Sequence, residues 1–437
     1  MLVRDRAGLE MMRCAQEEVR SLRGNPVPDD FHGGKLAAVW ARARKSPAFR
    51  GLPEFSWENF ESLPVMTKEG LKSDPWHYAV TDVSGAAKYY ETTGTTGRVT
   101  PTPRLAEDVI WNTVSVAEAW RSILRDGDRV AVLLPSDVVP VADLIVSVCE
   151  YLGLPHSRLY PFATGISDWD RLLGFWENLR PTTLFASPGV VLQLTRLLKQ
   201  RQLMAQHSSA VRDIMLLGEV STPPLRARLG QWWDATAHDA SYGSTETGTL
   251  AAACPRGRLH LLTGTNYFEL ATDQGLVPLP AHGKGRLVVT PLNLYARPML
   301  RLDTGDDVEI DTGGCDCPDR APVVVVCGRS SETIEIHGAR LTILGVENAV
   351  YGATEATGYL VEVDSTGQFG RLLLERGIGA DRAAEPAAIE ELQRLSENEL
   401  GLHWDAVVFV NSLPSTTKSG GSQKSWKRSN IRVVEPA

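Results

Sequence analysis

Short apolar runs alternate with amphipathic segments through the middle of the chain. Residues 129–135 (RVAVLLP) form an apolar run bounded by Asp128 and Pro135, which is typical of a buried strand. Residues 141–151 (VADLIVSVCEY) predict a helix behind it. The same order of strand and helix returns twice, at 183–187 with 190–201 and at 213–217 with 224–233. Strands that alternate with helices predict a parallel sheet of the α/β class.

The pattern changes on both sides of this region. The first 80 residues read as largely helical, with residues 36–46 (LAAVWARARKS) as one segment that ends near Pro47. Residues 259–326 hold short β segments separated by Gly, Pro and Asp. The end of the chain combines short strands with one strong helix, predicted at 385–400. We therefore expect an α/β protein with a β-rich subdomain and a small α+β domain at the C-terminus.

Composition narrows the class of protein. The chain has 437 residues, 43% of them hydrophobic, which at about 100–200 residues per domain predicts several structural units. Lys+Arg 45 against Asp+Glu 53 leaves a net charge of −8, so neither nucleic acid nor an anionic membrane is an expected partner. No run approaches the ~18 apolar residues of a membrane-spanning helix, and charges interrupt the N-terminal segment where a signal peptide is apolar. We expect a cytoplasmic protein.

Six cysteines in a chain of this length do not indicate a disulfide framework. Four residues, in the patterns Cys254-x5-His260 and Cys315-x-Cys317, instead supply the thiolate and imidazole ligands that suit tetrahedral Zn²⁺. Four protein ligands leave no open position, so such a zinc would be structural. The alternative is that these cysteines are small buried hydrophobes and the histidine is an ordinary strand residue.

Two glycine-rich segments have residues suited to nucleotides. Residues 92–98 (TTGTTGR) follow an apparent strand, and their glycines, N–H groups and hydroxyls suit a loop around phosphate, although an ordinary turn is the alternative. Residues 241–248 (SYGSTETG) bring together an aromatic ring, a hydroxyl and a carboxylate. These groups can stack on a base, contact phosphate and bind Mg²⁺, respectively. The alternative is an ordinary polar loop without any of these functions.

Two further segments extend the series. In residues 301–306 (RLDTGD), an Asp after a tight turn can accept hydrogen bonds from ribose hydroxyls, and an Asx-type turn is the alternative. Residues 328–341 begin Gly-Arg, and residues 413–428 (LPSTTKSGGSQKSWKR) hold three of the ten lysines of the chain.

In this order and spacing the segments resemble the adenylate-forming superfamily of acyl-CoA synthetases, adenylation domains and luciferases. The chain looks most like the phenylacetate–CoA ligase family, which shares its length and a segment similar to residues 41–71 (ARARKSPAFRG…LPVMTKEGL). The resemblance covers essentially the whole chain. It implies a large N-terminal adenylate-forming domain, residues 1–328, and a small mobile C-terminal lid, residues 329–437, joined at a hinge.

The resemblance implies an AMP-forming ligase. In the implied reaction, ATP and Mg²⁺ activate a carboxylic acid, expected to be an aryl acid, as an acyl-adenylate, and the acyl group then passes to CoA. An amide synthetase or a carrier-protein ligase, which hands the adenylate to an amine or a carrier thiol, remains open as an alternative. A non-catalytic relative is the third hypothesis. Homodimers are common in the family and are one expected assembly.

Matching positions imply the roles of individual residues. The β- and γ-phosphates would be cradled by Thr92, Thr93, Gly94, Thr95, Thr96 and Gly97. The residues expected around the adenine, the α-phosphate and Mg²⁺ are Gly218, Glu219, Tyr242, Gly243, Thr245 and Glu246. Of these, Thr245 would contact the α-phosphate and Glu246 would bind Mg²⁺. The ribose would be held by Asp306 and Arg329.

The chain departs from the family pattern in three places. Arg98 stands where the family usually has Lys, and Ser331 stands at the usual hinge Asp. A C-terminal lysine in the family offsets charge on the carboxylate and α-phosphate, and Lys424 is the favoured match, with Lys418 and Lys427 as alternatives. Loss of that lysine, with loss of a half-reaction, also remains open.

An acid pocket is expected at the carboxyl ends of the predicted strands, where open α/β sheets bind ligands. The expected lining segments are 135–140, 160–165, 187–189, 218–220 and 239–243. Tyr160 and Phe162 could face an aromatic ring, although core packing is an equal alternative for both.

Overall fold

The computed structural model describes residues 3, 5–23, 25, 27–28, 30–92, 99–163, 165–328, 334–414 and 430–434, and the main chain of residue 329. The chain forms two compact units. Unit 1 comprises Met1–Asp128, Pro135–His156 and Ala240–Arg329, and unit 2 comprises Arg129–Leu134, Ser157–Asp239 and Ser330–Ala437. The predicted domain boundary between residues 328 and 329 lies within one residue of a border between the units, and the division 1–328 and 329–437 itself stays a prediction.

The α-helices are α1 (Arg6–Leu22), α2 (Phe31–Ala43), α3 (Trp57–Glu61), α4 (Lys68–Ser73), α5 (Ala106–Trp120), α6 (Val141–Leu152), α7 (Trp169–Leu179), α8 (Pro188–Gln200), α9 (Met204–Ser208), α10 (Pro223–Trp233), α11 (Ile343–Ala353) and α12 (Glu385–Leu400). Short 3₁₀ turns are η1 (Pro47–Phe49), η2 (Val83–Gly85) and η3 (Arg382–Ala384). None of the helices in the described ranges is long and apolar enough to cross a membrane.

The strands are β1 (Lys88–Glu91), β2 (Pro101–Arg104), β3 (Val130–Leu133), β4 (His156–Arg158), β5 (Thr183–Ala186), β6 (Asp213–Leu216), β7 (Thr236–Asp239), β8 (Ser241–Ser244), β9 (Gly248–Ala253), β10 (Leu259–Leu261), β11 (Asn266–Thr272), β12 (Gly275–Pro278), β13 (His282–Pro291), β14 (Leu302–Asp311), β15 (Val323–Arg329), β16 (Ile334–Ile336), β17 (Ala339–Leu341), β18 (Gly358–Asp364), β19 (Gly370–Glu375), β20 (Ala406–Val410) and β21 (Ile431–Val434).

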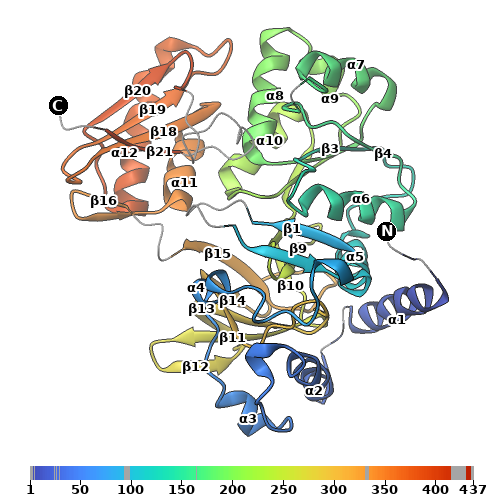
Figure 1. Ribbon diagram of the computed structural model, residues 1–437. Coiled ribbons are helices and arrows are strands. Elements are labelled where there is room, and N and C mark those ends of the chain that lie inside the picture. Colours follow the sequence, from blue (N-terminus) through green and yellow to red (C-terminus); the bar gives the residue numbers. More distant parts are fainter. Residues whose placement is uncertain are drawn as a thin grey trace. The chain divides into compact units, whose positions relative to one another are not determined.

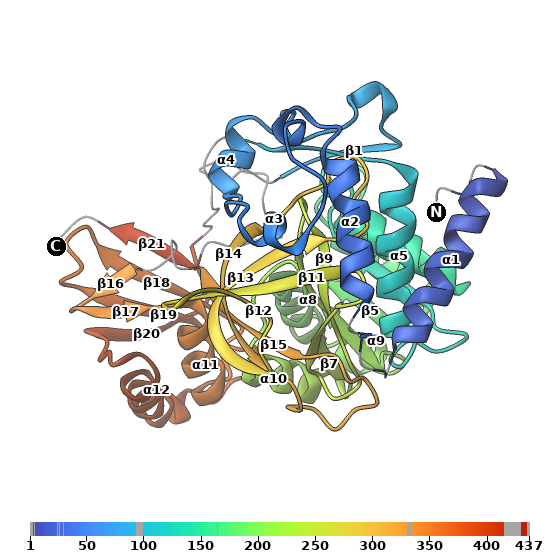
Figure 2. The ribbon, with the colours of Figure 1, turned by 90° about the horizontal axis from the view of Figure 1, so that it is seen from below.

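Unit 1 is built on an eight-stranded antiparallel sheet with the order β12-β11-β13-β14-β15-β10-β9-β8 (Figure 1). Its core gathers apolar side chains of α2 and of the central strands, including Trp40, Phe268 and Leu302. Helix α1 lies along α5 in both views (Figures 1 and 2), where Ala15 packs with Trp111. A separate antiparallel pair, β1 with β2, lies on either side of the predicted phosphate loop.

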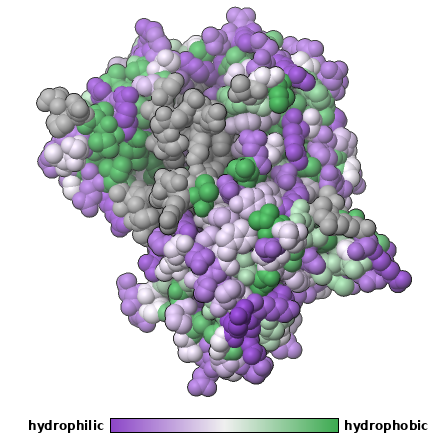
Figure 3. All heavy atoms as spheres, viewed as in Figure 1, coloured by the Kyte–Doolittle hydropathy of each residue, from purple (hydrophilic) through white to green (hydrophobic). Residues whose placement is uncertain are grey.

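Unit 2 contains the five-stranded sheet β4-β3-β5-β6-β7, in which β3, β5, β6 and β7 run parallel. All residues of β3, β5 and β6 are buried, which explains why these strands read as continuous apolar runs. The unit also holds a four-stranded sheet, β20-β19-β18-β21, with α11 and α12. On the face drawn in Figure 3, apolar residues gather over this sheet, whose edge strands expose Val408 and Val433.

The predicted α/β class and the strand–helix alternation are confirmed. The helix expected at 385–400 is α12, and the one expected at 141–151 is α6, which ends at Gly153 in a left-handed conformation with φ 71°. Segments 241–248 and 301–306, expected as loop and turn, are instead mostly strand, as β8, the start of β9 and the start of β14. Residues 241–248 form a local hairpin, in which Ser244 pairs with Gly248, whereas Leu302 and Asp303 pair with Val289 and Val288 of the preceding strand.

Candidate active site

Strands β1 and β2 bring the two ends of the predicted phosphate loop together. Their register pairs Glu91 with Pro101, and the Oγ1 of Thr92 accepts a hydrogen bond from the N–H of Thr100 at 2.9 Å. Residues Thr93–Gly97 and Arg98 lie outside the described residues. The residues on the two sides of this glycine- and hydroxyl-rich segment are therefore held next to each other.

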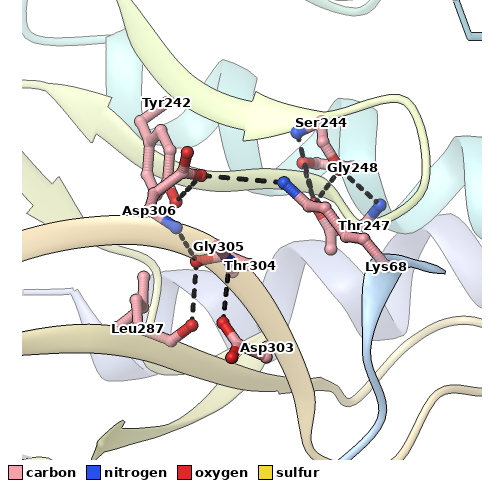
Figure 4. A network of polar contacts seen from close by, with 10 residues as sticks. All are labelled: Lys68, Tyr242, Ser244, Thr247, Gly248, Leu287, Asp303, Thr304, Gly305 and Asp306. Atoms are coloured by element: carbon pink, nitrogen blue, oxygen red, sulfur yellow. Dashed lines mark hydrogen bonds and ion pairs between the residues drawn. The ribbon is translucent and has the colours of Figure 1, made fainter. Parts of the chain in front are cut away.

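Tyr242 and Asp306, predicted separately as nucleotide residues, are in direct contact in unit 1. The hydroxyl of Tyr242 donates to Oδ2 of Asp306 at 2.7 Å. The ammonium of Lys68, the first residue of α4, lies 4.0 Å from the same oxygen (Figure 4). An aromatic ring, a carboxylate and a cation therefore share one corner of the sheet, a combination suited to a nucleoside phosphate.

A bulge in β14 sets the position of Asp306. The pairing of β13 with β14 passes from Arg286↔Asp307 to Val288↔Asp303, which leaves extra residues on β14. Within the bulge, Oγ1 of Thr304 donates to the carbonyl of Leu287 at 2.8 Å and accepts from the N–H of Asp306 at 3.2 Å (Figure 4). The N–H of Gly305 donates to the carboxylate of Asp303 at 2.8 Å, so the Asx-type turn uses Asp303 and leaves the role of Asp306 separate.

The turn between β8 and β9 carries Thr245 and Glu246. Ser244 and Thr247 close it, because the N–H of each donates to the side-chain oxygen of the other at 3.2 Å. The side chain of Glu246 is only 7% exposed. Gly243 is required here, since a Cβ at this position would lie 2.2 Å from the carbonyl oxygen of Gly248.

Gly218 and Glu219 lie in unit 2, immediately after β6. Gly218 has a φ of 88°, which favours glycine, and Oε2 of Glu219 accepts from the N–H of Gly189 at 3.1 Å. This bond links the start of α8, which follows β5, to the segment that follows β6. Among the expected acid-pocket residues of the same unit, Tyr160 and Phe162 are partly buried and pack against its hydrophobic core.

The structure describes only part of the other predicted ribose and catalytic residues. The main chain of Arg329 pairs with Asp306 across β14 and β15. Lys418, Lys424, Lys427 and Ser331 lie outside the described residues.

The four predicted metal ligands lie together. The ligand atoms of Cys254, His260, Cys315 and Cys317 are all within 4.8 Å of one another. They meet because β10, which carries His260, pairs with β9 on one side and β15 on the other. The side chains of Cys254, His260 and Cys317 are at most 5% exposed.

The spacing of these four residues fits zinc. The Sγ atoms of Cys254 and Cys315 are 3.7 Å apart, and Sγ of Cys317 is 3.3 Å from Nε2 of His260. A disulfide would need about 2.05 Å, whereas two ligands on a tetrahedral zinc with ~2.3 Å bonds are about 3.8 Å apart. The other ring nitrogen, Nδ1 of His260, lies 2.7 Å from the carbonyl of Ala321, the outer contact that orients a histidine ligand.

Three basic residues of this region were missed by sequence reasoning. Lys68 contacts Asp306. The buried Arg104 bonds to the Thr245–Glu246 turn, and the buried Arg297 bonds to Pro101, just after the predicted phosphate loop. Lys68 stands in the N-terminal segment that carried part of the family resemblance, but a single lysine on a short helix gives no signal of its own. The arginines lack a motif, and only their contacts reveal them.

Solved structures share this fold. A 2-hydroxyisobutyryl-CoA ligase in the postadenylation state, in complex with 2-HIB-AMP, matches with a TM-score of 0.77 and 18% identity over 92% of this chain and 88% of that one. The same ligase with 2-HIB-AMP and CoA in the thioesterification state matches with a TM-score of 0.63 and 19% identity over 94% and 91%. The anthranilate CoA ligase AuaEII in complex with anthranoyl-AMP follows at 0.54 and 16%, over 84% and 73%. No protein-family model and no curated protein matches the sequence.

Proposed function

We propose that this protein is an AMP-forming ligase that activates a carboxylic acid with ATP and transfers the acyl group to CoA. The contact of Tyr242 with Asp306 beside Lys68 is the observation that carries the proposal. The shared fold supports it, because solved structures with this fold include CoA ligases in complex with acyl-AMP.

The residues of unit 1 suit the first half-reaction. The ring of Tyr242 offers a stacking surface for adenine, and the Asp306 carboxylate can accept hydrogen bonds from two ribose hydroxyls. Lys68 adds a positive charge on this side, where a carboxylate and a triphosphate, both anions, have to meet. The turn that bears Thr245 and Glu246 offers a hydroxyl for the α-phosphate and a carboxylate ligand for Mg²⁺. When bound, Mg²⁺ would reduce the repulsion between the two anions.

Further residues, some of them outside the described ranges, complete the proposal. Thr92–Gly97 would cradle the β- and γ-phosphates, Gly218 and Glu219 would border the adenine, and Arg329 would hold the ribose. Lys424, or else Lys418 or Lys427, would offset the charge on the carboxylate during adenylation. Movement of a lid, residues 329–437, would withdraw that lysine before the acyl transfer.

The acid is proposed to be an aryl acid, as in the phenylacetate–CoA ligases that the sequence resembles. The bound anthranoyl-AMP of one structural neighbour supports an aromatic acid, whereas the 2-HIB-AMP of another keeps small hydroxy acids in the test panel. Because the predicted lysine loop and the CoA side depart from the family pattern, an amine or a carrier-protein thiol is the alternative acceptor. A cytoplasmic homodimer is the proposed form of the enzyme.

We also propose a structural Zn²⁺ held by Cys254, His260, Cys315 and Cys317. Thiolates and imidazole at tetrahedral separations support zinc over a hard cation that prefers oxygen ligands. Since the protein fills four positions, the metal would fix the ends of β9, β10 and the segment before β15, and would take no part in the reaction.

Acid-dependent exchange of ³²P between pyrophosphate and ATP tests the activity. Wild-type protein with MgATP and a panel of aryl, hydroxy and aliphatic acids should show exchange with at least one aryl acid. Asp306→Asn should lose most of it, while Asp311→Asn, an exposed change on the same strand, should not. No exchange with any acid would overturn the proposed function. Mass spectrometry of products formed with CoA, with amines or with carrier protein then identifies the acceptor.

A further inference from the structure

Two buried arginines in unit 1 are tied to strand β2, one as a member of the strand and one through hydrogen bonds to it. Arg104, the last residue of β2, is 7% exposed, and Arg297 is 1% exposed. Burying a guanidinium is costly unless its donors are satisfied, so two of them in one place need an explanation. Their positions give one, because β2 begins just behind the predicted phosphate loop.

Arg104 joins β2 to the turn that carries the predicted metal ligand. Its Nη2 donates to the carbonyl oxygens of Thr245 at 2.7 Å and Glu246 at 2.9 Å. These are the main-chain groups of the two residues whose side chains are assigned to phosphate and Mg²⁺. A single nitrogen thus fixes the peptide planes on either side of Glu246.

Arg297 holds the other end of β2. Its Nη1 donates to the carbonyl of Pro101 at 2.6 Å, and its Nη2 donates to Oγ1 of Thr102 at 3.1 Å. Pro101 follows Thr100, whose N–H bonds to Thr92 at the start of the phosphate loop. The two arginines therefore fasten the described ends of the loop and the Thr245–Glu246 turn to the same short strand.

The positive charge of the Arg104 and Arg297 guanidinium groups is only partly compensated. Burial is the main cause that lowers the pKa of both arginines, and the charge of Arg104 helps to lower the pKa of Arg297 to about 10. The nearby carboxylate of Asp108 is already bonded to the N–H groups of Leu105, Tyr295 and Ala296. Among the described residues, Nη1 of Arg104 and Nε of Arg297 have no hydrogen-bond partner. Positive charge is thus held next to Glu246 in a buried place, which favours an anionic ligand nearby.

We propose that Arg104 and Arg297 are positioning residues for MgATP: Arg104 sets the Thr245–Glu246 turn, and Arg297 sets β2 behind the phosphate loop. The inference rests on the proposed nucleotide site. It goes further in assigning the geometry of that site to two residues outside every recognisable motif. A purely structural role would make the same substitutions lower stability without changing nucleotide or Mg²⁺ binding.

Calorimetric titration with MgATP alone, without an acid, tests this inference. Arg104→Met should raise the Kd for MgATP about tenfold or more, as expected for lost hydrogen bonds to a charged group. Arg104→Lys keeps the charge but lacks the planar fork, and should raise Kd by a smaller factor. Both should also raise the Mg²⁺ concentration needed for half-maximal ATP binding. Arg297→Met should raise Kd with less effect on the Mg²⁺ requirement.

Arg20→Met is the matched control for stability. It removes a guanidinium that bonds twice to the buried Glu118, on helices α1 and α5 of the same unit. It should lower the melting temperature and leave the Kd for MgATP within about twofold of wild type. If the Arg104 variants behave like Arg20→Met, the two arginines are structural only and the inference is overturned.

Two further outcomes separate this inference from the proposed function. Wild-type protein that binds MgATP but shows no exchange with any acid overturns the ligase activity, while the Arg104 comparison still decides the inference. Wild-type protein that does not bind MgATP overturns the inference. Should Arg104→Met fail to fold, Arg104→Lys decides, and a Kd within twofold of wild type counts against the proposal.

Discussion

Arg301 and Glu269 form a buried ion pair at the start of β14, with side chains 6% and 5% exposed. The guanidinium donates to both carboxylate oxygens, at 3.0 and 2.9 Å, and to the carbonyls of residues 60, 61 and 63. Arg301 also has a φ of 54°, a strained conformation for a non-glycine residue that these bonds hold in place. We predict that Arg301→Met lowers the free energy of unfolding by about 4 kcal/mol at pH 7.

The magnitude follows from what the substitution leaves behind. Breaking a buried pair while one partner remains costs about 3–5 kcal/mol, and three carbonyls also lose their donor. Protonation of Glu269 limits the loss, because burial already raises the pKa of this carboxyl and removal of Arg301 raises it further. A group whose folded-state pKa is raised stabilises the fold below its unfolded pKa and loses that contribution as the pH rises. The cost of Arg301→Met should therefore grow between pH 5 and pH 8.

Urea unfolding followed by tryptophan fluorescence measures the effect. Glu269→Gln and the double variant with Arg301→Met complete a cycle, and the double variant should lose about 2 kcal/mol less than the sum of the single changes. Lys284→Met, which breaks an exposed pair with Glu309 in the same sheet, should stay within about 0.5 kcal/mol of wild type. A loss below about 1 kcal/mol for Arg301→Met, or additive single changes, would refute the reasoning.

Three other predictions concern the site and its surroundings. Asp306→Asn should raise the KM for ATP about 10–100-fold with little change in melting temperature, since it removes a charged acceptor, and steady-state kinetics beside Asp311→Asn measures this. Metal analysis of protein purified without chelator should find about one zinc per chain. Cys317→Ser should lose that zinc and melt at a lower temperature, whereas the exposed Cys14→Ser should do neither. Burial and the charge of Glu219 raise the pKa of Glu347, so its contribution to stability falls as the pH rises. The free energy of unfolding of Glu347→Gln in urea, relative to that of wild type, should therefore be higher at pH 9 than at pH 5. An equal difference between the two proteins at both pH values would contradict this.

The fold was predictable where one periodicity filled a whole element. Helix α12 agrees with its expected range, and β5 and β6 agree within a residue or two, because buried parallel strands leave long apolar runs. At residues 301–306, Asp and Gly indicate a turn, and an Asx-type turn does form at Asp303, but the segment belongs to strand β14, which the prediction missed. There β14 bulges against β13, and Leu302 and Asp303 pair with Val289 and Val288, which are 13 and 15 positions away along the chain. Local residue types cannot reveal that partner.

The candidate site also combines residues that the sequence predicts with contacts that only the fold reveals. Tyr242 and Asp306 were identified from their own segments, but their contact depends on how the strands of unit 1 are ordered. The four candidate zinc ligands lie together as their types and spacing predict, because β10 is short and pairs on both sides, and the zinc itself stays a prediction. Lys68 was missed because its role arises only when α4 comes beside β14, a contact between distant segments.

The choice of arginine over lysine explains how a chain with only ten lysines keeps cations inside unit 1. A lysine ammonium is compact, strongly hydrated and costly to bury, whereas a guanidinium spreads its charge over a planar fork of five N–H donors. Arg104 and Arg301 each bond two or more main-chain carbonyls through a single nitrogen, and Arg297 uses two nitrogens to bond one carbonyl and one hydroxyl. Each therefore fixes backbone as well as charge, which a lysine at the same place would do less well. For this reason Arg→Lys at these positions is not a conservative change.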